Sequence, residues 1–162
     1  MQGRIFSINI NAEKGEPKKM VASGVLRQGH GLEGDAHAGP GLRQVSMLSI
    51  EEIEGAEAVS GACGVDFRPG IFAENITIEY MDLSKLRVGD KIALGEEAVL
   101  EISQIGKDCH GGCSVAREAG LCIMPKQGIF ATVEKGGAIR VYDMVRVLGD
   151  VPKKRIFSWL KT

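Results

Sequence analysis

The chain has 162 residues, a formal net charge of −1 and a hydrophobic content of 44%. This length can bury one sizeable hydrophobic core, and the near-zero charge argues against the basic surface of proteins that bind nucleic acid or anionic membranes. The sequence shows no charged-then-apolar leader and no apolar run approaching the roughly 20 residues of a membrane span. We therefore expect a cytoplasmic protein whose four cysteines are thiols or ligands rather than disulfides. We expect one domain over residues 1–150, followed by a basic tail at 151–162.

Most of the predicted elements are strands, as expected for a chain with 22 glycines and only 5% aromatic residues. Residues 75–80 alternate and are rich in β-branched side chains, which is typical of a strand. The predicted strands cover residues 1–10, 20–26, 44–48, 75–80, 91–94, 98–105, 129–134, 138–141 and 145–148. Gly95 and Glu96 would turn one strand back into the next, and the Gly136-Gly137 pair predicts a hairpin between 129–134 and 138–141.

Helical signals are few. Ser49 and Glu52 have the spacing of a capping box, which predicts a helix that runs to Val59 and ends at Gly61. A shorter helix is predicted at 114–119, before Gly120. Residues 153–161 form a weakly amphipathic basic tail, helical or simply a docked or frayed terminus. The pattern predicts a mainly β protein with a closed or barrel-like fold and one or two short helices.

A dense group of reactive side chains follows the predicted strand at 98–105. Lys107, Cys109, His110 and Cys113 fall within seven residues of a glycine-rich turn. A turn at the end of a strand holds side chains on a rigid scaffold. Lys107 and His110 would stabilise a thiolate at Cys109, which would make it nucleophilic. The alternative is a polar turn whose cysteines are apolar filler.

The same cysteines permit two further interpretations. Cys109, Cys113 and Cys122 could bind zinc together with His110 or the distant Cys63, although zinc sites usually present two close cysteine pairs. Disulfide exchange normally uses two intervening residues and is less favoured by this spacing.

A second candidate site is the glycine-rich loop at 29–41. Asp35 and His37 are two residues apart, so an extended backbone would place both on one side. They could orient a ligand or a proton, or Asp35 could fix the tautomer of His37. The alternative is a solvated surface loop. Six basic residues near glycine or proline turns could converge on an anionic ligand, although we expect only two or three at any one site: Arg43, Arg68, Lys107, Arg117, Lys126 and Arg140.

Six ordered motifs resemble the MOSC domain, the C-terminal domain of molybdenum cofactor sulfurases that also occurs alone in bacteria. They are Gly34-Asp35-Ala36-His37, Val45-Ser46-Met47-Leu48, Phe72-Ala73-Glu74-Asn75-Ile76-Thr77, Val88-Gly89-Asp90, Lys107-Asp108-Cys109, and the segment from Gly136-Gly137 to Val145. Together they extend over nearly the whole chain, from about Gly3 to Leu148. The most specific part is Phe-Ala-Glu-Asn followed by the Val-Gly-Asp turn.

The resemblance implies a barrel-like β fold and one key cysteine after a strand, at Cys109. In the family this cysteine is thought to carry sulfur as a persulfide or to coordinate molybdenum, which makes Cys109 the expected metal contact. Matching positions imply that Asp35, His37 and Asn75 belong to the cofactor site, to which we add Arg43, Arg68 and Cys113 from the chemistry above.

The function implied is that of a protein that binds molybdenum cofactor (molybdopterin) and carries sulfur to it, or coordinates molybdenum. Family members act as sulfur transferases or reduce N-hydroxylated compounds. A cysteine desulfurase or another cofactor-biosynthesis protein would be the partner, and no pyridoxal phosphate is expected in this chain. Alternatives are a non-catalytic cofactor carrier or sensor, and a structural zinc protein.

Three departures from the family pattern put the reductase activity in doubt. The usual proline- and arginine-containing run before the cysteine is replaced by Ile105-Gly106-Lys107-Asp108, and His37 is followed by Ala38 rather than a second histidine. Near the end, Tyr142-Asp143 replaces a common Gly-Asp turn. Sulfur or cofactor handling is therefore the better-supported expectation.

Overall fold

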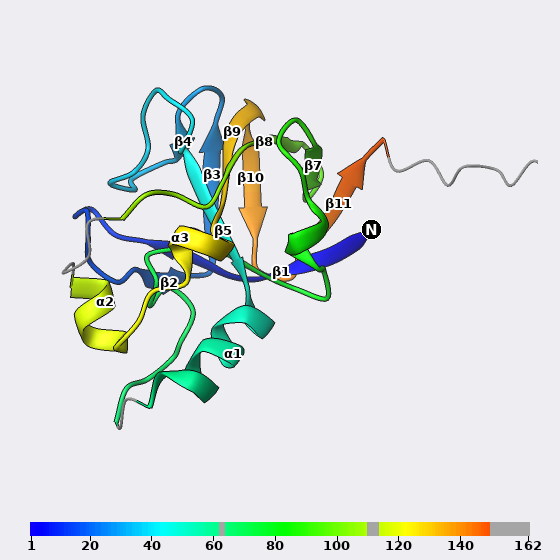
Figure 1. Cartoon of the computed structure of the whole chain (residues 1–162). Coiled ribbons are helices and arrows are strands. Elements are labelled where there is room, and N and C mark those ends of the chain that lie inside the picture. Colours follow the sequence, from blue (N-terminus) through cyan, green and yellow to red (C-terminus); the bar gives the residue numbers. More distant parts are fainter. Residues whose placement is uncertain (62–63, 110–113, 150–162) are drawn as a thin grey trace, which may run out of the picture.

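Seven strands close into a mixed β-barrel in the computed structural model, which describes residues 1–61, 64–109 and 114–149 (Figure 1). The barrel strands are β1 (Gln2–Ile10), β5 (Val45–Ser49), β6 (Ile76–Glu79), β7 (Lys91–Leu94), β8 (Ala98–Ile105), β9 (Ile129–Lys135) and β11 (Met144–Leu148). Around the barrel they run in the order β1, β11, β7, β8, β9, β5, β6, and β6 pairs back with β1. Closure leaves no free barrel edge, and the prediction of a mainly β, barrel-like fold is confirmed.

Four further strands flank the barrel. β2 (Lys19–Val21) extends β1, while β10 (Gly137–Arg140), β3 (Ser23–Arg27) and β4 (Gly31–Leu32) form a separate three-stranded sheet. Among the strands described, β5 and β6 make the one parallel pair. The chain crosses from β5 to β6 through α1 (Ile50–Ser60), as parallel neighbours require.

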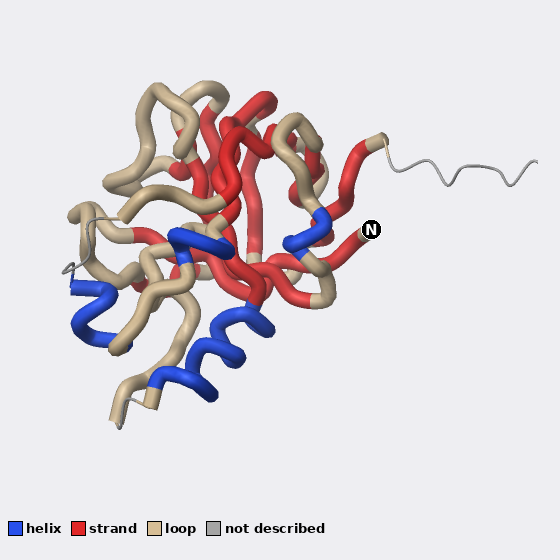
Figure 2. Tube along the Cα trace, viewed as in Figure 1, coloured by secondary structure: helices blue, strands red, loops and turns tan. Residues whose placement is uncertain are grey.

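Helices pack outside the barrel (Figure 2). Besides α1, the structure has α2 (Ser114–Ala119), α3 (Met124–Gln127) and the 3₁₀ turn η1 (Leu83–Lys85). Two apolar clusters result. One includes the fully buried side chains of Ile5, Ile78 and Leu100 on the barrel strands. The other joins Phe72 and Phe130 to residues of α1, α2 and α3.

The predicted capping box of α1 is confirmed. The Ser49 hydroxyl accepts the Glu52 N–H at 3.1 Å, and the Glu52 carboxylate accepts the Ser49 N–H at 2.9 Å. Gly61 ends the helix in the left-handed conformation, with φ of 64°. The bounds predicted for β7, β8 and α2 also match those observed.

The predicted hairpin at Gly136-Gly137 is wrong. β9 pairs with β8 and β5, whereas β10 pairs with β3, so the chain passes from the barrel into the small sheet instead of turning back. Glycine is required at this crossing because a Cβ on Gly136 would lie 2.6 Å from the Leu26 carbonyl oxygen.

Other differences are smaller. The single strand predicted at 20–26 is divided into β2 and β3, and β4, α3 and η1 were not predicted. The predicted tail helix at 153–161 lies outside the described residues. Within residues 1–61, 64–109 and 114–149, no helix has the length and apolarity needed to cross a membrane.

Candidate functional site

A pocket of about 440 Å³ lies where the loop before β5, the loop before β6 and the end of β8 meet. Atoms of the largely buried Phe72 and Phe130 form part of its wall. Its charged side chains are cationic: Lys14, Arg43 and Lys107. Its volume falls within the range of small-molecule sites, and several polar groups converge on it. The cations predict an anionic ligand.

A larger pocket of about 670 Å³ lies against α1, but its chemistry is different. Its charged lining is acidic and includes Glu51, Glu52 and Asp82, without a cysteine or histidine. The smaller pocket is therefore the better candidate for chemistry on an anionic ligand.

Lys107 is fixed in the pocket by contacts of its own backbone. Its N–H donates to the Pro125 carbonyl at 3.0 Å, and the preceding Gly106 N–H donates to the Gly128 carbonyl at 2.7 Å. Gly106 has a φ of 69°, and a Cβ there would lie 2.4 Å from the Pro125 oxygen. The end of β8 is thus held against α3. Cys109 follows two residues later and is exposed.

Arg43 lies on the opposite loop of the pocket, above an aromatic ring. Its guanidinium carbon is 6.0 Å from the centroid of Phe130, within the range of a cation–π contact. Next to it, the buried Gln44 side chain accepts the Val133 N–H at 2.9 Å. The Leu42 carbonyl accepts the Ser103 hydroxyl. These bonds tie the Arg43 loop to β8 and β9.

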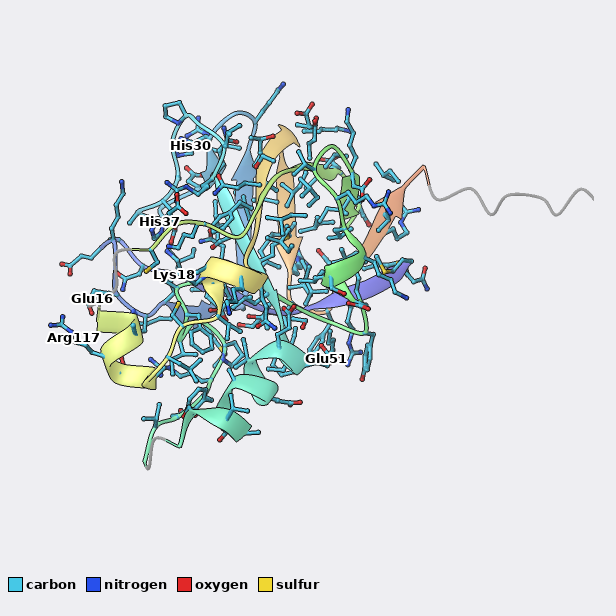
Figure 3. All side chains as sticks on the ribbon, viewed as in Figure 1. Glu16, Lys18, His30, His37, Glu51 and Arg117 are labelled. Atoms are coloured by element: carbon cyan, nitrogen blue, oxygen red, sulfur yellow. The ribbon has the colours of Figure 1, made fainter. Side chains whose placement is uncertain are left out.

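A buried lysine lies beneath the pocket, beside the two predicted residues of the glycine-rich loop. Lys18 and His37 are labelled in Figure 3. Lys18 is completely buried, and its ammonium lies 2.7 Å from Asp35 Oδ1 and 3.0 Å from His37 Nδ1. Asp35 also accepts the backbone N–H of Asn11 at 3.1 Å and of His37 at 3.0 Å. The carboxylate therefore joins three segments that are separate in sequence.

The environment favours one charge state for each group. Burial raises the pKa of Asp35, but hydrogen bonds from Lys18 and Asn11 outweigh it and leave the pKa below its usual value. Burial and the positive charge of Lys18 lower the pKa of His37 to about 4. At neutral pH the site holds an aspartate beside a neutral imidazole.

Asn75 is fully buried under the pocket and holds two strands together. Its Oδ1 accepts the Ser46 N–H at 3.1 Å, and its Nδ2 donates to the Asn9 carbonyl at 3.4 Å. Ser46 itself lines the pocket. Asn75 thus sets the position of the pocket floor.

The neighbouring Glu74 organises the loop before β6. Its buried carboxylate accepts the N–H groups of Gly70 at 2.5 Å and Phe72 at 3.1 Å, and the Thr77 hydroxyl at 3.1 Å. Burial raises the pKa of Glu74 to about 7. Between these contacts Ala73, which lines the pocket, is held at a φ of 62°. A non-glycine residue in that region is strained and requires such support.

The sequence-predicted residues fall into four groups. His37, Arg43 and Lys107 line the pocket, and Asp35 and Asn75 are buried beneath it. Cys109 is exposed beyond Lys107, while Arg68 is half-buried and is not part of the pocket lining. His110 and Cys113 lie outside the described residues.

Sequence reasoning missed Lys18, which the charge pattern placed in an exposed turn at 11–19. Nothing local marks this lysine as buried, since the acidic partner that makes burial tolerable is seventeen residues away. Lys14, from the same turn, lines the pocket.

Residues 33–146 match the MOSC domain, which is more than half of the chain. The chain belongs to the MOSC domain family. The resemblance of its motifs to that family is thereby confirmed. Among curated proteins, none matches this sequence.

Solved structures with the same fold include three bacterial proteins. The YuaD protein from Bacillus subtilis is 21% identical with a TM-score of 0.74, and the match covers 91% of this chain and 96% of that one. YiiM from Escherichia coli is 18% identical with a TM-score of 0.67, covering 91% and 70%. YiiM from Geobacillus stearothermophilus is 20% identical with a TM-score of 0.65, covering 90% and 75%. At these identities the similarity concerns the fold.

The described residues contain no group of three or more histidine, cysteine, aspartate or glutamate side chains that could hold a metal ion. Three of the five residues predicted for a structural zinc site, Cys63, His110 and Cys113, fall in the gaps of the described ranges. The zinc hypothesis therefore stays a prediction, which metal analysis of the purified protein would test.

Proposed function

We propose that this MOSC protein binds the molybdenum cofactor in the pocket between Arg43 and Lys107. The observation that carries the proposal is the lining itself: three cationic side chains converge on a pocket of about 440 Å³ whose wall includes atoms of Phe72 and Phe130. The cofactor combines an anionic phosphate with a flat pterin. Cations suit the phosphate, and the aromatic atoms in the wall are of the kind that a pterin contacts.

Cys109 would be the residue that reacts. A thiolate is a soft ligand suited to molybdenum or to sulfur transfer, and the exposure of Cys109 gives a partner protein access to it. Because the backbone of Lys107 is held against α3, the neighbouring thiol follows a fixed part of the pocket wall. When bound, the cofactor would supply a molybdenum centre that accepts sulfur or coordinates the thiolate.

The sulfur-loading step needs a donor persulfide, such as that of a cysteine desulfurase. The Cys109 thiolate attacks the outer sulfur of the donor, forming a new S–S bond, while the S–S bond of the donor breaks and its cysteine leaves as a thiolate. The terminal sulfur and its proton move to Cys109 together. No external oxidant or reductant is consumed.

The test compares wild type, Cys109→Ser and the matched control Cys122→Ser, each incubated with molybdenum cofactor and a persulfide donor. Cys122 is half-buried and packs against the cluster of Phe72 and Phe130, so we expect its substitution to leave sulfur loading intact. Intact-mass analysis should detect one added sulfur in wild type and Cys122→Ser but not in Cys109→Ser. Equal loading and equal cofactor binding in all three would refute a role for Cys109.

Cofactor binding itself is tested by charge removal. Arg43→Gln and Lys107→Gln should each weaken binding by about tenfold, the value of one lost charge-assisted contact. Arg140→Gln is the control, since Arg140 is exposed on β10 in the small sheet. Cofactor binding without any persulfide on Cys109 would favour the non-catalytic carrier over the sulfur transferase.

A further inference from the structure

The ammonium of Lys18 has no exposure to solvent. Burying a charge is costly unless it is paired and hydrogen-bonded. Asp35 provides the opposite charge at 2.7 Å, but a lysine–aspartate pair alone does not explain the third member of the group. The Lys18 ammonium also lies 3.0 Å from Nδ1 of His37, whose ring lines the pocket and is about one-third exposed.

We propose that Lys18 is a positioning residue, which locks His37 as the neutral tautomer that carries its proton on Nε2 and offers that N–H to an oxygen of the pocket ligand. An ammonium group has three donors and no acceptor. Nδ1 of His37 must therefore be the acceptor at this contact, and the ring proton must be on Nε2.

Asp35 does not fix the tautomer by itself. Its Oδ2 is 3.8 Å from Nδ1 of His37, too far for a hydrogen bond, and accepts the His37 backbone N–H instead. Lys18 therefore has the role that sequence analysis offered to Asp35, which is to fix the tautomer of His37. Asp35 orients the imidazole through the backbone and neutralises the lysine.

The backbone fixes Lys18 as firmly as its side chain does. Its N–H donates to the Gly70 carbonyl at 2.8 Å. Gly70 has a φ of 90°, and a Cβ there would lie 2.4 Å from the Lys18 carbonyl oxygen. Gly70 is held in turn by Glu74. The position of the Lys18 ammonium beside His37 is therefore supported by a fixed backbone as well as by its own side-chain contacts.

Protonation of His37 would break this arrangement. Two donors would then face each other at 3.0 Å, and the positive charges of Lys14 and Lys107 also oppose a cationic ring. Burial acts in the same direction, whereas Asp35 favours the charged form. Their balance agrees with the low pKa of about 4.

As a chemical consequence, the neutral His37 ring adds a hydrogen-bond donor to the pocket without adding a positive charge to those of the three cationic side chains. Lys14, Arg43 and Lys107 attract an anion, while a neutral Nε2–H recognises one acceptor oxygen by direction. We expect this donor to favour a ligand that presents an acceptor oxygen in its direction. This consequence rests on the proposed anionic ligand, whereas the tautomer does not.

The first experiment reads the tautomer directly by ¹⁵N NMR of the imidazoles in the full chain, without any ligand. His37 is assigned by its absence from the His37→Gln spectrum. We expect Nδ1 to resonate as an unprotonated nitrogen and Nε2 as a protonated one, unchanged from about pH 8 down to about pH 5. A protonated Nδ1, or a ring that titrates near its ordinary pKa, would overturn the proposal.

The second experiment removes the lock in Lys18→Met/Asp35→Asn, because deleting one charge alone would leave its partner buried and unpaired. The His37 pKa should then rise and the two tautomers should mix. If the protein unfolds, the wild-type spectrum still decides. A folded double variant with the wild-type tautomer would show that Lys18 does not set it.

The third experiment uses molybdate as the probe, followed by NMR shift changes. In the His37→Gln variant, the glutamine amide can donate in place of Nε2–H without help from Lys18. The Lys18→Met/Asp35→Asn change should therefore weaken molybdate binding severalfold in wild type and have no effect in a His37→Gln background. Equal weakening in both backgrounds would indicate a merely structural role. If His37 has the predicted tautomer but neither molybdate nor phosphate binds, the role of Lys18 in setting the tautomer stands. The proposed anionic ligand is then refuted instead.

Discussion

Asp35 accepts a hydrogen bond of 2.7 Å from the ammonium of Lys18, which is seventeen residues away in sequence. The two side chains are almost completely buried. The same carboxylate receives the backbone N–H groups of Asn11 and His37. One aspartate therefore joins the turn after β1, the segment before β2 and the glycine-rich loop of the pocket. The wall of the pocket depends on this junction.

Replacing Asp35 by asparagine should be strongly destabilising. The substitution keeps the shape but leaves the Lys18 ammonium buried without a counter-charge, which typically costs about 3 kcal/mol or more. Urea unfolding of Asp35→Asn should show a free energy of unfolding lower by roughly that amount. Glu33→Gln is the control, because Glu33 makes an exposed ion pair with Arg27 at 3.8 Å and should change stability by less than about 1 kcal/mol.

Two groups give the stability of the protein opposing pH dependences. Burial raises the pKa of Glu74 to about 7 from an ordinary value of 4.5. The folded state therefore holds this proton longer than the unfolded chain, and its contribution falls as the pH rises from about 4.5 to about 7. Its size is at most roughly 3 kcal/mol. His37, with its pKa lowered from 6.5 to about 4, contributes stability that falls as the pH drops through the same window.

Separate substitutions should reveal each contribution. In wild type we expect a shallow pH dependence of the unfolding free energy between about pH 4.5 and about pH 6.5, since the two contributions oppose each other. In His37→Gln the unfolding free energy should decrease as the pH rises, because only the Glu74 contribution remains. In Glu74→Gln it should increase as the pH rises. Glu74→Gln should also cost about 1–3 kcal/mol, because an amide nitrogen cannot accept the Phe72 N–H. Identical slopes in all three proteins would contradict the assignment.

Local signals predicted much of the barrel. The capping box of Ser49 and Glu52 and the limits of β7, β8 and α2 depend on neighbours within a few residues, so they can be read from the chain. The Gly136-Gly137 pair gave a wrong hairpin prediction, because a hairpin turn and a close crossing of two backbones both require glycine. What distinguishes them is the Leu26 carbonyl 2.6 Å from the Gly136 Cβ position, a contact over more than a hundred residues.

The site was predictable where chemistry is local. His37, Arg43 and Lys107 stand near glycines that shape the pocket loops, and all three line it. Lys18 was hidden because its burial depends on a carboxylate brought close by the fold. Asn75 was marked by its motif, but its buried position between Ser46 and Asn9 follows from the barrel alone.

The crossing from β9 into β10 can be tested by adding one methyl group. Gly136→Ala should destabilise the protein by about 1–3 kcal/mol, since a Cβ meets a backbone oxygen that cannot move aside without distorting β3. Gly55→Ala is the matched control within α1, where a Cβ meets nothing within 4 Å. It should stabilise by roughly 0.5–1 kcal/mol through helix propensity. Thermal unfolding of both variants separates the cases, and a stabilising Gly136→Ala would contradict the crowding.

The charge of Lys107 should be detectable at His37. Burial is the main reason for the low pKa of the imidazole, followed by Lys18, with a smaller contribution from Lys107. Lys107→Gln should therefore raise the pKa of His37 modestly, whereas Lys126→Gln, the same change on the exposed face of neighbouring α3, should not. The NMR titration of His37 measures both. The difference should shrink as salt is added, because the two groups meet in a pocket open to solvent. Equal effects of the two substitutions would mean that Lys107 does not direct its charge into the pocket, and its predicted contribution to anion binding there would be refuted.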